Sequence, residues 1–179
     1  MSKLPYPLNI TDLLSLETFF AAVATELGGF DEYRYVSAGE EGAQEIQHLF
    51  EKVFLPNQRI LLAQIAETPL TDNATGLTRA TFACSLLVLE KMGGAGTTPA
   101  DKLEARNRTW LAMLRVVGQI RQSAEYAAAM ATEEDEVEFT IYQDRLLPIG
   151  RIANAQVQGW LLDVDVTIPV NQYLFPEEG

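Results

Sequence analysis

The chain has 179 residues, of which 47% are hydrophobic and 21% charged, and it carries a formal net charge of -12. These values are typical of one globular domain with its own core, and we expect a single domain over residues 1–179. The excess of acidic side chains disfavours binding of DNA or of anionic membranes by the body of the protein, because phosphate groups would be repelled.

Several other classes are excluded by particular residue types. No stretch approaches the roughly 18 consecutive apolar residues of a membrane span, and the N-terminal residues lack the pattern of a secretory signal, so we expect a protein that is neither exported nor membrane-bound. Cys84 and His48 are the sole cysteine and histidine. They exclude an intrachain disulfide and leave too few soft ligands for zinc, and we expect no cofactor.

The N-terminal part predicts an arm, a helix and a short strand. Two prolines in residues 1–9 favour an extended arm. Apolar residues at three-and-four spacing predict a helix over about 11–27, with Asn9 or Thr11 as its N-cap. Tyrosine and valine at 33–36 favour a strand.

A second helix and a hairpin follow. Ser37 and Glu40 match a capping box, and the helical pattern they open ends at Pro56. From there the apolar period changes to two. The β-rich runs 59–69 and 78–90 are separated by turn-forming residues, which predicts an antiparallel hairpin.

The glycine-rich run 93–98 precedes a long predicted helix over about 99–130, which Thr98 or Asp101 can cap. Its spacing predicts a buried stripe. The residues of this predicted stripe are Leu103, Trp110, Leu111, Leu114 and Val117.

The last third alternates with the period of strands. After the acidic run 133–136, two segments at 137–142 and 160–170 predict strands, and residues 171–179 read as a short acidic tail. The whole order predicts an α+β fold, with one antiparallel sheet and helices packed on one face. The open edge of the final long strand, or the tail after it, is expected to be satisfied by a neighbouring subunit.

Candidate chemistry is sparse. His48 lacks a nucleophile signature or a second histidine, and we interpret it as a surface or boundary residue. Cys84 falls on the apolar face of its strand and is interpreted as a core residue. The glycine-rich run 93–98 could cradle a phosphate before a helix, but it lacks the spacing of known phosphate-binding fingerprints, which favours a connector.

Two carboxylates merit a separate hypothesis. Asp163 and Asp165 lie on one face of the last strand, where they could share a cation or act as an acid and a base. Alternating aspartates more often form a solvated strand face, and the run 133–136 is more often a solvated turn. The basic side chains of the long helix are interpreted as partners of acidic groups, on this or a neighbouring copy. They are Lys102, Arg106, Arg108, Arg115 and Arg121.

The order of helices and strands over nearly the whole chain resembles that of the tail terminator and tail-completion proteins of tailed bacteriophages and phage-tail-like particles. The C-terminal strand at 159–170 and the Leu147-Pro148-Ile149 segment before it also resemble the corresponding parts of these proteins. Those proteins are small α+β proteins that form a ring, commonly of six subunits, on the end of the tail tube.

The resemblance implies a non-enzymatic virion protein of the tail or neck, assembled in the host cytoplasm. It would form a homo-oligomeric ring, expected to be a hexamer, that stops tube polymerisation. Its partners would be other copies of itself, the tail tube protein and the neck or head–tail connector protein. DNA would pass through the acidic lumen without specific binding.

Two alternatives remain open. One is a soluble metal-dependent hydrolase that uses Asp163, Asp165 and a third carboxylate. The other is a monomeric assembly chaperone or binding module whose acidic surface masks a basic partner.

Overall fold

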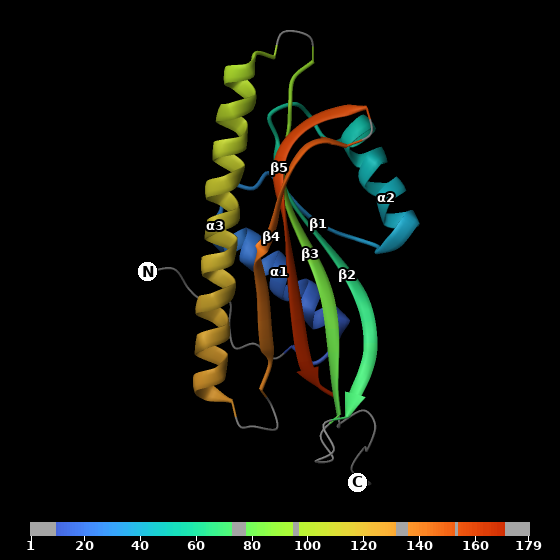
Figure 1. Ribbon diagram of the computed structural model, residues 1–179, viewed down its shortest axis with the longest axis vertical. Helices are drawn as coiled ribbons and strands as arrows, with labels where there is room; N and C mark the ends of the chain where they lie inside the picture. Colours follow the sequence, from blue (N-terminus) through green and yellow to red (C-terminus); the bar gives the residue numbers. More distant parts are fainter. Residues whose placement is uncertain (1–9, 73–77, 95–96, 132–135, 153, 171–179) are drawn as a thin grey trace.

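A computed structural model describes residues 10–72, 78–94, 97–131, 136–152 and 154–170. Five strands form one sheet in the order β1-β2-β3-β5-β4, with helices beside it (Figure 1), and the expected single α+β domain is confirmed. The elements are α1 (Leu13–Leu27), β1 (Glu32–Val36), α2 (Gly39–His48), the π-helical turn η1 (Leu49–Val53), β2 (Arg59–Asp72), β3 (Thr78–Lys91), α3 (Pro99–Met130), β4 (Glu138–Ile152) and β5 (Ala155–Pro169).

Some expectations fall outside this description. The predicted arm over 1–9, the acidic tail over 171–179 and residues 133–135 of the acidic run lie outside the described residues. The same is true of residues 73–77, which join the two strands of the predicted hairpin.

The sheet is mixed rather than wholly antiparallel. The pairs β2–β3, β3–β5 and β4–β5 are antiparallel as expected, but β1 runs parallel to β2. A parallel pair needs a long crossover connection, and α2 with η1 supplies it between β1 and β2. The order strand, helix, strand at 32–72 is therefore a βαβ unit within an otherwise antiparallel sheet.

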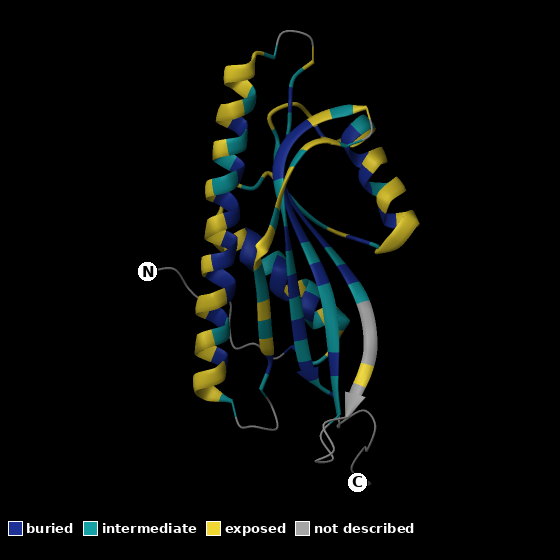
Figure 2. Ribbon diagram, viewed as in Figure 1, coloured by how far each residue is buried: buried dark blue, intermediate teal, exposed yellow. Residues whose placement is uncertain are grey.

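Helices cover both faces of the sheet, not one as expected. α1 and α3 pack on the first face, where alternate strand residues such as Leu61, Leu86 and Val164 are buried. α2 and η1 pack over part of the opposite face, where Ile60 and Leu87 are buried (Figure 2). Strands β2 and β3 contain consecutive apolar residues, so both of their faces need cover.

The last strand is interior rather than at the edge. β5 is hydrogen-bonded to β3 on one side and to β4 on the other, which corrects the expectation of an open edge there. The edges of the sheet are β1 and β4. In β4 the register with β5 shifts between Tyr142 and Leu147 and again near Gly150, so this edge is irregular.

The N-cap predicted from the sequence is confirmed for α3, but the N-caps of α1 and α2 differ from the prediction. Thr98 and Asp101 form the capping box of α3. α1 is capped by Asp12, whose Oδ1 accepts a hydrogen bond from Ser15 N at 2.7 Å, rather than by Asn9 or Thr11. The capping box expected for α2 does not form, because α2 starts after Ala38 without a side-chain cap.

Candidate functional site

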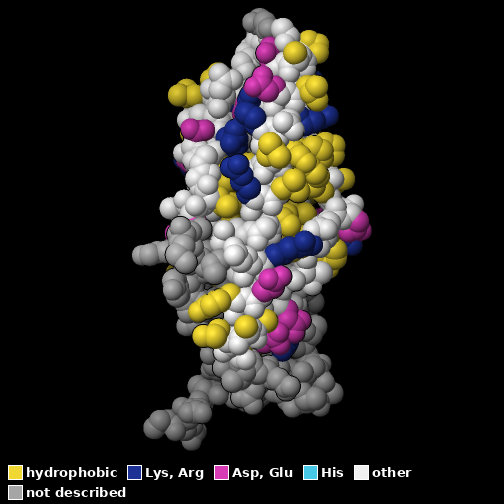
Figure 3. Space-filling model, turned by 90° about the vertical axis from the view of Figure 1, so that its left-hand side faces the viewer, with side chains coloured by type: hydrophobic (Ala, Val, Ile, Leu, Met, Phe, Trp, Pro, Cys, Tyr) yellow, Lys and Arg dark blue, Asp and Glu magenta, His cyan; other side chains and the backbone are white. Residues whose placement is uncertain are grey.

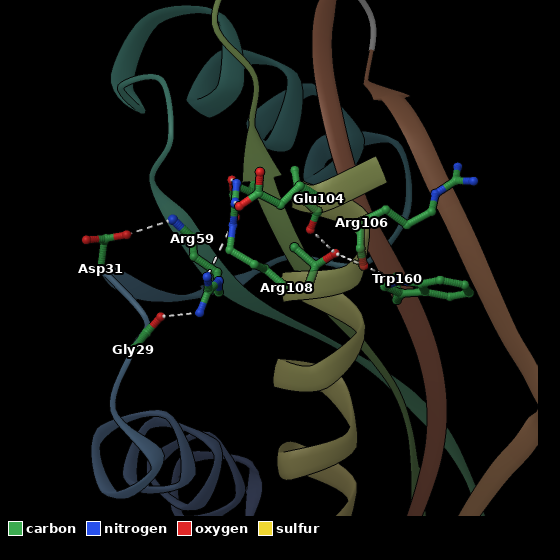
Figure 4. A network of polar contacts seen from close by, with 10 residues as sticks. Gly29, Asp31, Arg59, Glu104, Arg106, Arg108 and Trp160 are labelled. Carbon is green, nitrogen blue, oxygen red and sulfur yellow. Dashed lines mark hydrogen bonds and ion pairs between the residues drawn. The ribbon is translucent and has the colours of Figure 1, made fainter. Parts of the chain in front are cut away.

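A buried carboxylate ties α3 to the sheet. Glu90 of β3 is 2% exposed, and its two oxygens accept hydrogen bonds from Arg108 of α3, at 3.2 Å from Nε and 2.5 Å from Nη2. Arg108 also donates from Nη1 to Glu104, at 2.7 Å (Figure 4). The hydrogen bond with Glu90 raises the pKa of Arg108 above its ordinary value. This bidentate pair keeps a charge buried because the charge is matched.

Arg59 extends the same network to the loop between α1 and β1. Its Nη2 lies 3.7 Å from Glu90 Oε2, and its Nη1 donates to the Gly29 carbonyl at 3.2 Å. The Arg59 backbone N donates to Asp31 Oδ2 at 2.7 Å. We define Glu90, Arg59, Arg108 and Glu104 as the Glu90 network. Its four charges are paired with one another, although the buried Nε of Arg59 has no hydrogen-bond partner, and the network holds β2, β3 and α3 together.

Sequence reasoning predicted acidic partners for Arg108, which the pairs with Glu90 and Glu104 confirm, but it missed that Glu90 is buried and that Arg59 belongs to the same network. The signal available was a glutamate that ends the apolar run of β3 and an arginine that opens the apolar run of β2. The antiparallel register places Arg59 and Glu90 opposite each other. A charge at such a position is buried only where a partner is supplied, and the partner on α3 is not visible in the sequence.

A hollow of about 550 Å³ opens beside Arg108, between the start of α3 and the glycine-rich connector. The polar side chains that line it are Asn57, Thr97, Asp101, Glu104 and Arg108. Asp101 accepts the hydrogen bonds at the start of α3, from Thr98 N and Oγ1 at 2.7 Å each. Because a carboxylate occupies this helix terminus, the site does not favour a phosphate, in agreement with the interpretation of the connector.

The two aspartates of β5 are held by hydrogen bonds across the sheet. Asp163 accepts from Ser85 Oγ at 2.8 Å, and Asp165 accepts from the Tyr142 hydroxyl at 2.7 Å. The bond to Asp165 raises the pKa of Tyr142 above its ordinary value. Within the described ranges, no group of three His, Cys, Asp or Glu side chains is placed to hold a metal ion.

The other candidate residues lie apart from each other. Cys84 of β3 is buried in the core between the sheet and the helices α1 and α3. Burial raises the pKa of its thiol to about 12, so it carries no thiolate near neutral pH. His48 is exposed on the last turn of α2. The structure does not bring Cys84 and His48 to one site.

The predicted buried stripe of α3 is wrong at most of its positions. Val117 is buried, but Leu103 is 69% exposed, Leu111 49% and Leu114 44%. Trp110 is half-buried against Trp160 of β5, with ring centroids 4.7 Å apart. The side of α3 that packs on the sheet consists mostly of small or polar residues. They are Ala105, Thr109, Ala112, Met113, Val116, Val117, Gln119, Ile120, Ser123 and Ala127.

An apolar strip with a basic border therefore remains on the outside of α3. Figure 3 shows hydrophobic side chains gathered beside a column of basic ones on the flank that carries α3. Arg115 and Arg121 are exposed, and neither makes an ion pair within the described part of the chain. We define the α3 surface by six residues, which are Leu103, Trp110, Leu111, Leu114, Arg115 and Arg121.

The outward side of α2 has the opposite charge. Glu40 and Glu41 are exposed and Glu45 is half-buried, and none of the three makes an ion pair within the described residues. Just beyond the helix, Val53 is 42% exposed and Leu55 is 64% exposed. We define these five residues as the α2 surface.

Comparisons with known proteins give no assignment. No protein-family model matches the chain, and no curated protein sequence matches it. Within the described ranges, none of the helices combines the length and the apolar character needed to cross a bilayer.

Proposed function

We propose that this protein is a non-enzymatic structural subunit that assembles with copies of itself into a ring. The ring caps the end of a phage-type tail tube and joins it to the neck or head–tail connector. The α3 surface is the observation that carries the proposal, because a folded chain of this size with an ordinary core still leaves a row of large apolar side chains in water.

The remaining sites support this choice because their carboxylates are already bonded. The Glu90 network pairs each of its charges, and the β5 aspartates accept hydrogen bonds from Ser85 and Tyr142. An active site instead needs a group that is free to move a proton or hold a ligand. The surfaces left without partners are those that another protein would cover.

The overall charge fits passage of DNA through the ring. A net charge of -12 per subunit repels phosphate groups, so a channel formed by several copies lets DNA slide through without binding it. The further partners of this ring are the tail tube protein and the neck connector. The ring acts in the virion.

The test is the molar mass of the full chain in solution. Size-exclusion chromatography with light scattering is expected to give a multiple of 19.8 kDa, six-fold for a hexamer, and electron microscopy is expected to show a closed ring with a central opening. A chain that stays at 19.8 kDa over the accessible concentration range would overturn the proposal.

A further inference from the structure

The α3 surface has a chemistry that selects its partner. From Ala105 to Ala124 the helix contains four arginines and no acidic residue. Arg108 belongs to the Glu90 network, but Arg115 and Arg121 border the exposed leucines without an ion pair within the described residues. If the α3 surfaces of two copies contacted each other, the arginines of one copy would face those of the other, and these like charges would repel.

The α2 surface is the complement of the α3 surface. From Gly39 to Glu51 the chain contains four glutamates and no lysine or arginine. Ile46, Leu49 and Phe50 turn inward to the sheet, so the glutamates face away from it. Val53 and Leu55, which follow the exposed Lys52 beyond the C-terminal end of α2, add apolar area to this surface, as exposed leucines do to that of α3. Matching of both charge and apolar character is what a specific contact requires.

The two surfaces lie where they cannot meet within one molecule. α3 packs on β5, β3 and β4, near the β4 edge and on one face of the sheet. α2 packs near β1, at the other end of the strand order and on the opposite face (Figure 1). A contact between two different surfaces is heterologous. Repeating it closes a ring when the rotation that relates neighbouring subunits is a whole-number fraction of a full turn.

We propose that the α3 surface of one copy docks on the α2 surface of the next, head to tail. This inference rests on the proposed function and names the interface of the ring. Leu111 and Leu114 are buried at the contact, and Arg115 and Arg121 lie against Glu40 and Glu41 of the next copy.

The test uses two charge-reversal variants of the full chain. The first is Arg115→Glu with Arg121→Glu, and the second is Glu40→Arg with Glu41→Arg. Each is expected to raise the dissociation constant of self-association at least about tenfold, because like charges then face each other. Glu26→Arg is the control, since Glu26 is exposed on α1, outside both surfaces, and this variant should assemble like the wild type.

Mixing the two variants gives the decisive result. In an alternating assembly, the acidic α3 surface of the first variant faces the basic α2 surface of the second, and the other junctions keep the wild-type signs. A one-to-one mixture is therefore expected to recover particles of the wild-type size, measured by light scattering, while each variant alone stays small.

Other outcomes separate this interface from the proposed function. If the wild type assembles but Glu40→Arg with Glu41→Arg assembles equally well, the α2 surface is not the partner and this inference is overturned, while the ring proposal stands. A mixture that forms only a two-chain species overturns it too, because it indicates contact between two like surfaces, α3 with α3 or α2 with α2. A wild type that remains monomeric contradicts both proposals.

Discussion

At the scale of single residues, Glu90 shows how a buried charge joins separate elements. Its carboxylate is 2% exposed, yet it pairs with Arg108 on α3 and lies near Arg59 on β2. Arg59 in turn holds the Gly29 carbonyl before β1. Removing one member of such a set leaves the rest buried with unmatched charge, which costs more than the net worth of the pair.

We therefore expect Arg108→Met to lower the free energy of unfolding by about 2 kcal/mol or more, because Glu90 loses its bidentate partner. The control is Arg115→Met on the same helix, where the side chain is exposed, and it should change stability by about 0.5 kcal/mol or less. Urea unfolding measures both, at dilutions where light scattering gives the monomer mass. Equal effects of the two substitutions would show that the Glu90 network does not stabilise the fold.

The buried thiol of Cys84 predicts a loss of stability at alkaline pH. Burial raises its pKa from 9.0 to about 12 in the folded chain. Above about pH 9 the unfolded chain releases this proton while the folded chain keeps it, so stability falls as pH rises toward 12. Burial also raises the pKa of Tyr33, which acts in the same direction.

The measurement is the free energy of urea unfolding between pH 8 and about 10.5, where one such group contributes a slope of up to about 1.4 kcal/mol per pH unit. Cys84→Ala should be less stable than the wild type at pH 8 because a cavity forms, but its dependence on pH should be shallower. An identical slope in both proteins would contradict the assignment to Cys84.

At the scale of elements, the sequence predicted the order of the helices and strands, but neither the extent of β4, expected over 137–142 and observed over Glu138–Ile152, nor the side of α3 that faces the core. Periodicity placed α3 at about 99–130, and the structure has it at Pro99–Met130. The large leucines were expected to face the core. They do not, because the side of the helix that faces the sheet carries small residues such as Ala105 and Ala112 instead. Hydrophobicity alone does not distinguish a core stripe from a surface that another protein covers.

The sequence contained features that predict the parallel β1–β2 pair and the burial of both faces of the sheet. Strand, helix, strand over 32–72 is the order of a βαβ unit, and the runs Ile60–Ala63 and Leu86–Leu89 lack the alternation of a strand with one wet face. The pairing of β5 with both β3 and β4 had no local signal, because strand order depends on contacts between distant segments.

Substitutions at two glycines test the packing of β5 against β3 and the regularity of α3. A Cβ at Gly159 of β5 would lie 2.2 Å from the Val88 carbonyl oxygen, whereas a Cβ at Gly118 of α3 would meet nothing within 4 Å. Gly118→Ala should raise the free energy of unfolding by about 0.5–1 kcal/mol through helix propensity. Gly159→Ala should lower it, because β3 and β5 must separate.

Thermal unfolding of the two glycine variants beside the wild type checks this pair. A stable Gly159→Ala variant would show that β3 and β5 lie further apart than described. No gain from Gly118→Ala would show that α3 does not continue as a regular helix through this position.

At the scale of the whole molecule, the basic and apolar α3 surface and the acidic α2 surface lie at opposite ends of the strand order of the sheet. Within the chain their charges have no ion-pair partners among the described residues, and the proposed head-to-tail contact would supply them from a second copy. Composition indicated only that the net charge is acidic. The clustering of arginines in the α3 segment and of glutamates in the α2 segment is present in the sequence, but only the fold places these two segments at opposite ends of the sheet.

The most direct test of self-assembly through α3 is the light-scattering mass of Leu111→Glu with Leu114→Glu. A matched control is Leu14→Glu, because Leu14 is 72% exposed on α1, away from both surfaces. We expect the control to keep the wild-type oligomeric mass and the double variant to fall to 19.8 kDa with an unchanged circular dichroism spectrum. A folded double variant that keeps the oligomeric mass would contradict the account.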